Sequence, residues 1–253
     1  MKRKLWPLAV VVALAACRGS LAPDAAPQPS DLTVDQLIAK YETARGGDEK
    51  LKGIRSVKMT GTWELRGSGA SPVTVMITPG HYLRRIEQSS GKATINAVDG
   101  QTTWSINPQL GLLRPSPMVP KDAARFRRLA DPQGPLVDSQ AKGNKVEVVG
   151  KLPWHDSQVY KLKVTFSDGA VSHLYLDAKS FLPVRFVGSL LTPDGQDIDI
   201  EYVYEDFRDV DGIKWPFVEK ANAPSANFTQ TISWKTIEVN QPLDESAFKA
   251  PAS

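Results

Sequence analysis

The sequence predicts a mainly β protein whose single antiparallel sheet is curved into an unclosed half-barrel, with a few helices as a lid. Three observations lead to this fold class. Apolar and polar residues alternate in about a dozen short runs, Asp-Gly pairs separate several of these runs, and few segments have helical periodicity. Because strand twist accumulates, a sheet of so many strands cannot stay flat and has to curl or close.

A helix is expected at the start of the folded part of the chain. Thr33 and Gln36 form a capping-box pattern, and apolar residues follow at helical spacing until Gly46-Gly47 ends the run. A short helical turn over residues 48–52 then leads into the first strand. One apolar face of the first helix therefore needs a partner, which the sheet can supply.

The alternating runs begin after Ser56, and their order along the chain predicts a meander. The expected strands are 57–65, 73–78, 82–87, 93–98, 103–107, 146–150, 159–166, 171–176, 184–190, 198–204, 213–219 and 228–239. Asp-Gly pairs supply the positive φ angles of tight hairpin turns, and they occur at Asp99-Gly100, Asp168-Gly169, Asp194-Gly195 and Asp211-Gly212. Between these strands, only segment 121–130 and a short turn at 135–140 look helical.

The beginning of the chain has the pattern of an export signal. A positive start at residues 2–4 is followed by the apolar stretch 5–16, which is too short to span a membrane because a span needs about 20 apolar residues. The stretch ends in Leu14-Ala15-Ala16-Cys17, which resembles the lipobox of bacterial lipoproteins. We therefore predict a signal peptide over 1–16 and a lipid, such as palmitate, attached at Cys17. A lone cysteine is more commonly buried, but this position argues for lipidation.

Residues 17–31 are expected to form a flexible tether, because proline, alanine, serine and glutamine dominate a segment that cannot bury much apolar surface. Residues 32–250 then form a single domain, expected to be monomeric. The residue after the cysteine is Arg18, whereas aspartate there commonly signals retention in the inner membrane. We therefore expect attachment to the outer membrane, facing the periplasm.

The composition and motifs favour a binding protein over an enzyme. The net charge is only +3, which gives no reason to expect a nucleic-acid partner. The three histidines, His81, His155 and His173, have no spacing typical of a metal site, and the motifs of serine hydrolases and phosphate-binding loops are missing from the sequence. We predict no catalytic residue, no metal and no cofactor.

The concave face of the sheet is the candidate ligand site. The side chains expected there are Met59, Trp63, Val75, Ile95, Trp104, Tyr160, Leu162, Tyr175, Phe186, Tyr202, Trp215 and Trp234. The same pattern is typical of a barrel interior filled by its own side chains. Two helices, however, are few to cover so large a sheet, so both a cavity and a filled core stay open at this point.

Segment 121–130 combines an apolar face with a basic one. Arg125, Arg127 and Arg128 share the segment with Ala123 and Phe126, as expected for an amphipathic helix. It can be a solvated lid packed on the sheet, or its arginines can contact anionic head groups of a lipid or lipoprotein. In the second case Arg84 and Arg85 can add to the contact.

Several short motifs together resemble the outer-membrane lipoprotein-sorting family, with its LolA/LolB-like fold, and follow in order from about residue 33 to 248. They are Ala44-Arg45-Gly46-Gly47-Asp48-Glu49-Lys50-Leu51-Lys52, Asp99-Gly100-Gln101-Thr102-Thr103-Trp104, Gly134-Pro135-Leu136-Val137-Asp138, Tyr160-Lys161-Leu162, Tyr175-Leu176-Asp177 and Asp211-Gly212-Ile213-Lys214-Trp215-Pro216. The resemblance implies a half-barrel around an apolar cavity that accepts acyl chains or lipoproteins.

Cys17 makes the topology similar to that of the family's membrane-anchored acceptor rather than its soluble carrier. The acceptor's protruding apolar loop would then correspond to residues 108–120. A second function stays open, that of an envelope sensor or structural lipoprotein whose concave sheet binds a protein segment.

Overall fold

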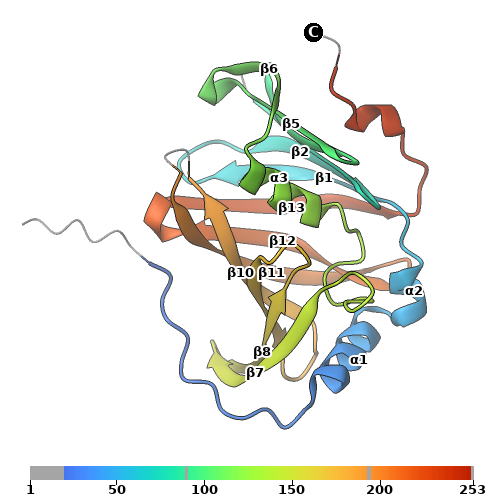
Figure 1. The fold of residues 1–253 in the computed structure, drawn as a ribbon, viewed down its shortest axis with the longest axis vertical. Helices are drawn as coiled ribbons and strands as arrows, with labels where there is room; N and C mark the ends of the chain where they lie inside the picture. Colours follow the sequence, from blue (N-terminus) through green and yellow to red (C-terminus); the bar gives the residue numbers. More distant parts are fainter. Residues whose placement is uncertain (1–19, 89–90, 193–194, 252–253) are drawn as a thin grey trace, which may run out of the picture.

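The computed structural model describes residues 20–88, 91–192 and 195–251, and a single sheet dominates it (Figure 1). The sheet has 13 antiparallel strands in the order β6-β5-β4-β3-β2-β1-β13-β12-β11-β10-β9-β8-β7, and within the described chain its two ends do not pair with each other. The strands are β1 (Val57–Leu65), β2 (Ser71–Thr78), β3 (His81–Glu87), β4 (Ala93–Asp99), β5 (Thr102–Asn107), β6 (Leu112–Pro117), β7 (Lys145–Trp154), β8 (Ser157–Thr165), β9 (Val171–Asp177), β10 (Pro183–Leu191), β11 (Asp197–Val210), β12 (Ile213–Ala223) and β13 (Phe228–Val239). The predicted fold class is confirmed.

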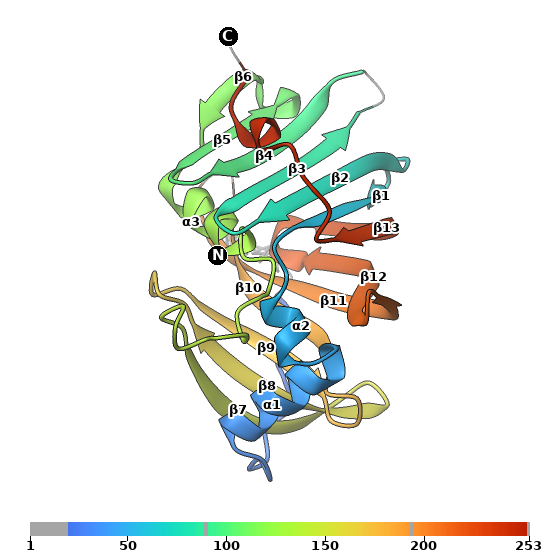
Figure 2. The same ribbon diagram turned by 90° about the vertical axis from the view of Figure 1, so that its right-hand side faces the viewer.

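The sheet is strongly bent, as strand twist requires of so many strands. Figure 2 shows β1–β6 as one arm and β7–β10 as the other, with β13, β12 and β11 joining them. The bend gives the sheet a concave and a convex side, and successive residues of each strand alternate between these two sides.

The backbone conformation of the turn residues explains why consecutive strands pair as a meander. Val210 and Ile213 pair across the β11–β12 hairpin, and the two residues between them, Asp211 and Gly212, have φ angles of 53° and 78°. Positive φ at both central positions is the geometry of a type I′ turn, which matches the twist of the flanking strands. Asp194, in another expected turn, lies outside the described residues.

Three α-helices accompany the sheet: α1 (Val34–Arg45), α2 (Asp48–Lys52) and α3 (Pro120–Leu129). The capping box at α1 is confirmed, since Gln36 N donates to Thr33 Oγ1 and Thr33 N donates to Gln36 Oε1. Helix α1 buries Leu37 and Tyr41 in the main core cluster. No described helix has the length and apolar character needed to cross a bilayer.

A glycine allows the end of α1 to approach the sheet closely. Gly46 has a φ of 134°, and a Cβ placed on it would lie 2.2 Å from the backbone oxygen of Gly212 in the β11–β12 turn. Only glycine can adopt this φ and leave room for that contact.

One element differs from the prediction. Strand β6 forms within segment 108–120, which was expected to be a loop. The short turn expected at 135–140 is present as bends and turns, without a helix. The prolines of this segment, Pro108, Pro115, Pro117 and Pro120, make a strand difficult to recognise in the sequence because proline is rare in strand interiors. Pro115 and Pro117, which lie in β6, are tolerated because β6 is an edge strand.

The segment before α1 lies along the convex side of β7–β10 (Figure 1). Gln28 forms an isolated antiparallel bridge with Lys151 of β7. The Asp24 carboxylate accepts hydrogen bonds from Lys161 Nζ at 2.6 Å, Tyr175 OH at 2.7 Å and Arg185 Nη1 at 2.6 Å. The bounds of the tether remain a prediction. The contacts of Asp24 and Gln28 with the sheet could not be predicted from the composition of this segment.

Candidate functional site: a cavity between the arms of the half-barrel

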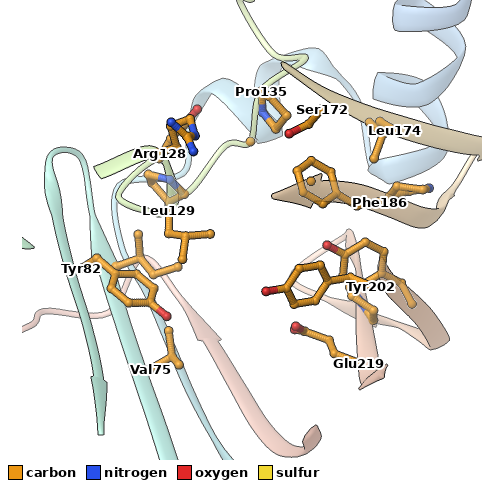
Figure 3. A pocket seen from close by; sticks show the side chains of 18 of the residues that line it. Val75, Tyr82, Arg128, Leu129, Pro135, Ser172, Leu174, Phe186, Tyr202 and Glu219 are labelled. Carbon is orange, nitrogen blue, oxygen red and sulfur yellow. The ribbon is translucent and has the colours of Figure 1, made fainter. Parts of the chain in front are cut away.

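A cavity of about 350 Å³ lies on the concave side of the sheet, between its two arms. In Figure 3, Val75 and Tyr82 form one wall, Phe186, Tyr202 and Glu219 form the opposite wall, and Leu129 lies above the space between them. The volume is within the range of small-molecule sites, which are about 300–1,000 Å³ and mostly apolar.

Side chains alternate between the two sides of each strand, and this alternation determines which residues line the cavity. On β3, Tyr82 and Arg84 line the cavity, while Leu83 between them belongs to a core cluster on the convex side. On β9, Ser172 and Leu174 line it in the same way. Helix α3 packs against β3, β4, β5 and β10, so it lies across the space between the arms as a lid.

Half of the residues named from the sequence meet at this cavity. Its lining includes Met59, Val75, Phe186, Tyr202, Trp215 and Trp234. Trp215 and Trp234 are each less than a tenth exposed, so their rings form part of the wall and little of them reaches solvent.

Trp63, Leu162 and Tyr160 lie outside the lining. Trp63 is partly buried near the end of β1, where its Nε1 donates to Gln230 Oε1 at 2.8 Å. Leu162 and Tyr160 belong to the main core cluster together with Leu37 and Tyr41 of α1. The filled-core alternative therefore describes the part of the concave face that α1 covers.

Ile95, Trp104 and Tyr175 are buried in clusters away from the cavity. Ile95 and Trp104 pack with Phe248 of the C-terminal 3₁₀ turn (Glu245–Phe248), and Trp104 Nε1 donates to the Phe248 carbonyl oxygen at 2.8 Å. Tyr175 packs with Leu152 and Val159 and bonds Asp24. Chain segments cover the convex side at these points, so an apolar residue there does not mark the concave face.

The three lid arginines have different surroundings. Arg125 and Arg128 line the cavity, and Arg128 also forms an ion pair with Asp168. Arg127 points elsewhere and donates to the Gln101 carbonyl oxygen at 2.8 Å. The helix therefore presents two of its three predicted arginines to the site.

Sequence reasoning missed two polar side chains of the cavity lining, Arg45 and Glu219. Of the two strand arginines expected to add to a head-group contact, Arg84 lines the cavity and Arg85 does not. Arg45 Nη1 donates to Tyr41 OH at 2.9 Å, and Arg84 Nη2 donates to Asn96 Oδ1 at 3.0 Å. Arg84 alternates with Tyr82 and Ile86 on β3, whose concave side is otherwise apolar.

Glu219 is the acidic group inside this site that has no ion pair among the described residues. Its Oε1 accepts a hydrogen bond from Trp234 Nε1 at 2.7 Å. Burial raises the pKa of Glu219, although the Trp234 hydrogen bond and the charge of Arg84 act in the opposite direction. Burial also raises the pKa of Tyr204, another lining residue, well above its ordinary value.

The described residues contain no group of three His, Cys, Asp or Glu side chains that could hold a metal ion. The lining residues make the site an apolar cavity with a few charged groups in its wall, an arrangement suited to enclosing an amphiphilic ligand.

Comparison with solved structures identifies the fold. A LolA superfamily protein from Nitrosomonas europaea is similar with a TM-score of 0.55 and 12% sequence identity, over 86% of this chain and 98% of that one. A Vibrio parahaemolyticus domain assigned to outer membrane lipoprotein sorting gives 0.55 and 11%, over 85% and 95% of the two chains. A DUF1329 family protein from Desulfovibrio piger gives 0.56 and 12%, over 84% and 97%. The chain has a LolA-like fold.

Neither protein-family models nor the sequences of curated proteins match this chain. Because the sequence identity to these solved structures is only 11–12%, their similarity is evidence for the fold and not for the function.

Proposed function

We propose that this protein is a membrane-anchored envelope lipoprotein that binds acyl chains or lipoproteins in the cavity of its half-barrel. The observation that carries the proposal is the cavity of about 350 Å³ under helix α3, walled largely by aliphatic and aromatic side chains. Each buried CH₂ of a chain contributes about 0.8 kcal/mol, so ten methylenes can supply several kcal/mol after the cost of association. The function is binding, with no catalytic step.

The anchor and the location complete the proposal. We assign the lipid to Cys17, which lies outside the described residues, and the protein to the periplasmic side of the outer membrane as a monomer. Support comes from the short apolar stretch before Cys17 and from Arg18 after it.

The hairpin between β5 and β6 suits contact with a membrane or with cargo. Leu110 and Leu113 are 59% and 62% exposed, and Val119 nearby is 52% exposed. Neighbouring exposed apolar side chains commonly mark interaction surfaces. We propose that this hairpin has the role of the acceptor's protruding loop.

Two adjacent residues of β10 test the cavity as the binding site. Phe186 lines the cavity, whereas Val187 packs in the cluster around Tyr175 on the other face of the strand. With the neutral fluorescent ligand N-phenyl-1-naphthylamine, we expect Phe186→Gln to weaken binding at least about tenfold, which is about 1.4 kcal/mol. Val187→Gln should leave the affinity within about twofold. Circular dichroism and the Tm of each variant establish that it is folded.

Equal affinities of the two folded variants would contradict the cavity as the site. Native mass spectrometry of protein extracted from membranes then identifies what the wild type carries. A copurified protein segment with no lipid would favour the alternative function, a sensor or structural lipoprotein whose concave sheet binds protein.

A further inference from the structure

The cavity wall contains buried hydrogen-bond donors that have no acceptor. In the described part of the chain, Arg45 Nε, Arg84 Nε, Arg125 Nε and Trp215 Nε1 are buried without a partner, and all four residues line the cavity. Buried polar groups are paired in the great majority of cases, and an unpaired one is unfavourable. Four such donors in one cavity indicate a ligand that brings acceptors.

Across the residues that the structure describes, the charges of Arg45 and Arg84 are also not compensated by an ion pair. The hydrogen bonds of Arg45 and Arg84 go to uncharged oxygens, those of Tyr41 and Asn96, and among the described residues neither arginine has an ion pair. Arg125 has an ion pair with Asp122 at 3.9 Å, which compensates part of its charge but is too long to give Nε a hydrogen bond.

The acidic groups of the lining do not balance this charge. Asp131 is paired with Lys142 at 2.8 Å. Glu219 remains, but burial raises the pKa of its carboxyl group and so opposes its negative charge. The cavity therefore favours an anion over a neutral or cationic group.

Two of the arginines, one on a strand and one on the lid helix, lie near the same aromatic ring. The guanidinium carbons of Arg84, on β3, and Arg125, on α3, lie 5.8 Å and 4.4 Å from the centre of the Phe126 ring. A guanidinium presents its N–H groups in a planar fork that matches the oxygens of a carboxylate or a phosphate. Arg45, also in the lining, lies over the Trp215 ring at 5.1 Å.

We propose that the cavity takes an anionic amphiphile whose carboxylate or phosphate head binds between Arg84 and Arg125 inside the half-barrel, with its chain along the apolar wall. Arg45 and Trp215 bind further oxygens of the same ligand. This inference rests on the proposed function and narrows it, because it places the head group inside the protein rather than in solvent.

Three ligands with the same twelve-carbon chain test the inference on the full wild-type protein. Dodecanoate, dodecyl phosphate and 1-dodecanol are titrated against bound N-phenyl-1-naphthylamine, and displacement gives each Kd. We expect at least one of the two anions to bind at least about tenfold more tightly than the alcohol, which is about 1.4 kcal/mol. The tighter of the two anions identifies the head group as carboxylate or phosphate.

Equal binding of all three ligands would overturn the anionic head group and leave the acyl-binding function intact. If neither the reporter nor any of the three ligands binds, the proposed function fails as well. Both results are obtained with the wild-type protein, so neither depends on whether a variant folds.

Matched variants then locate the head group. Arg84→Gln and Arg125→Gln should each weaken the tighter anion about tenfold and change the Kd of 1-dodecanol less than about twofold. The controls are their neighbours Arg85→Gln and Arg127→Gln, since Arg85 pairs with Glu87 at the surface and Arg127 bonds the Gln101 carbonyl. If all four variants lose the same affinity for the anion, the anion is attracted by the positive surface charge in general, and the assigned head-group site is wrong.

Discussion

The indole Nε1 of Trp234 donates a hydrogen bond to Glu219 Oε1 over 2.7 Å inside the cavity. This contact joins an aromatic wall residue to a carboxyl group whose pKa is raised by burial, against the opposing effects of the Trp234 hydrogen bond and the charge of Arg84. Glutamine at position 219 would keep an oxygen acceptor for Trp234 and remove the buried charge.

We therefore expect Glu219→Gln to raise the Tm at pH 7 by roughly 2–4 °C, the shift that about 1 kcal/mol produces in a chain of this size. A carboxyl whose pKa is higher in the folded state binds its proton more tightly there, so the wild type gains stability as the pH falls toward the unfolded-state pKa. The advantage of the variant should consequently shrink from pH 7 to pH 4.5. Thermal unfolding at several pH values measures it, with the exposed Glu205→Gln as control.

The same variant should bind dodecanoate or dodecyl phosphate roughly threefold more tightly than the wild type, because a negative charge leaves the site. Weaker binding of the anion would contradict an electropositive cavity.

Asp24 is predicted to hold the N-terminal segment on the convex side of the sheet. Burial opposes its charge, but hydrogen bonds from Lys161, Tyr175 and Arg185 outweigh that effect and lower the pKa of Asp24 to about 2. Against the ordinary value of 3.8, this lowering of the pKa corresponds to about 2 kcal/mol of stability at neutral pH. Asp24→Asn should lose up to about that amount.

The lowered pKa also determines how the stability contribution of Asp24 changes with pH. Because the folded pKa is lowered, the contribution is present above the unfolded pKa and disappears as the pH falls toward the folded one. The difference between wild type and variant should be constant from pH 5 to 7 and vanish between about pH 4 and 2. Urea unfolding measures it, with Asp31→Asn as control because Asp31, which bonds Tyr160 and lies 3.9 Å from Lys151 Nζ, is 66% exposed. A difference that persists at pH 2 would argue against this account.

The sheet could be predicted because it is encoded locally. Alternation with a period of two and Asp-Gly turns specify neighbouring antiparallel strands, and the hairpin at Asp211-Gly212 forms as expected. Capping residues likewise specify α1. Strand β6 was missed because its prolines are compatible with an edge strand, and position in the sheet is not a local property of the sequence.

The cavity could be predicted only in part because alternation does not identify the covered side. Trp104 and Tyr175 are as buried as Trp215 and Trp234, but the C-terminal turn and the N-terminal segment bury them from the convex side. These coverings come from distant parts of the chain. The unpaired donors of Arg45 and Arg84 depend on three-dimensional placement and leave no pattern in the sequence.

Trp104 should consequently matter for stability and little for binding. Its ring packs with Ile95 and Phe248 and is 4% exposed. Trp104→Ala should cost about 3–5 kcal/mol of unfolding free energy, as large-to-small changes of buried aromatics do. At a temperature where the variant is folded, its Kd for N-phenyl-1-naphthylamine should match that of the wild type. If the variant instead loses binding while its stability is unchanged, Trp104 belongs to the ligand site.

Cys17→Ala should prevent lipidation, because the thiol is the predicted acceptor of the lipid. We expect an uncleaved precursor or soluble protein, and no incorporation of radiolabelled palmitate. Arg18→Asp is the companion variant, expected to be lipidated but retained in the inner membrane. Normal processing and normal pelleting of Cys17→Ala protein with membranes would refute the anchor.

The exposed hairpin side chains Leu110 and Leu113 should contribute to contact with membranes or cargo and not to folding. Changing both to Gln removes apolar surface that is already in solvent, so the Tm should change by less than about 2 °C. Binding of the protein without its lipid to phospholipid vesicles, measured by co-sedimentation, should fall severalfold. The control is Val171→Gln on β9, which is 44% exposed and lies on a strand far from the hairpin in the sheet order. If the control reduces vesicle binding as much as the double change does, the apolar hairpin has no special role.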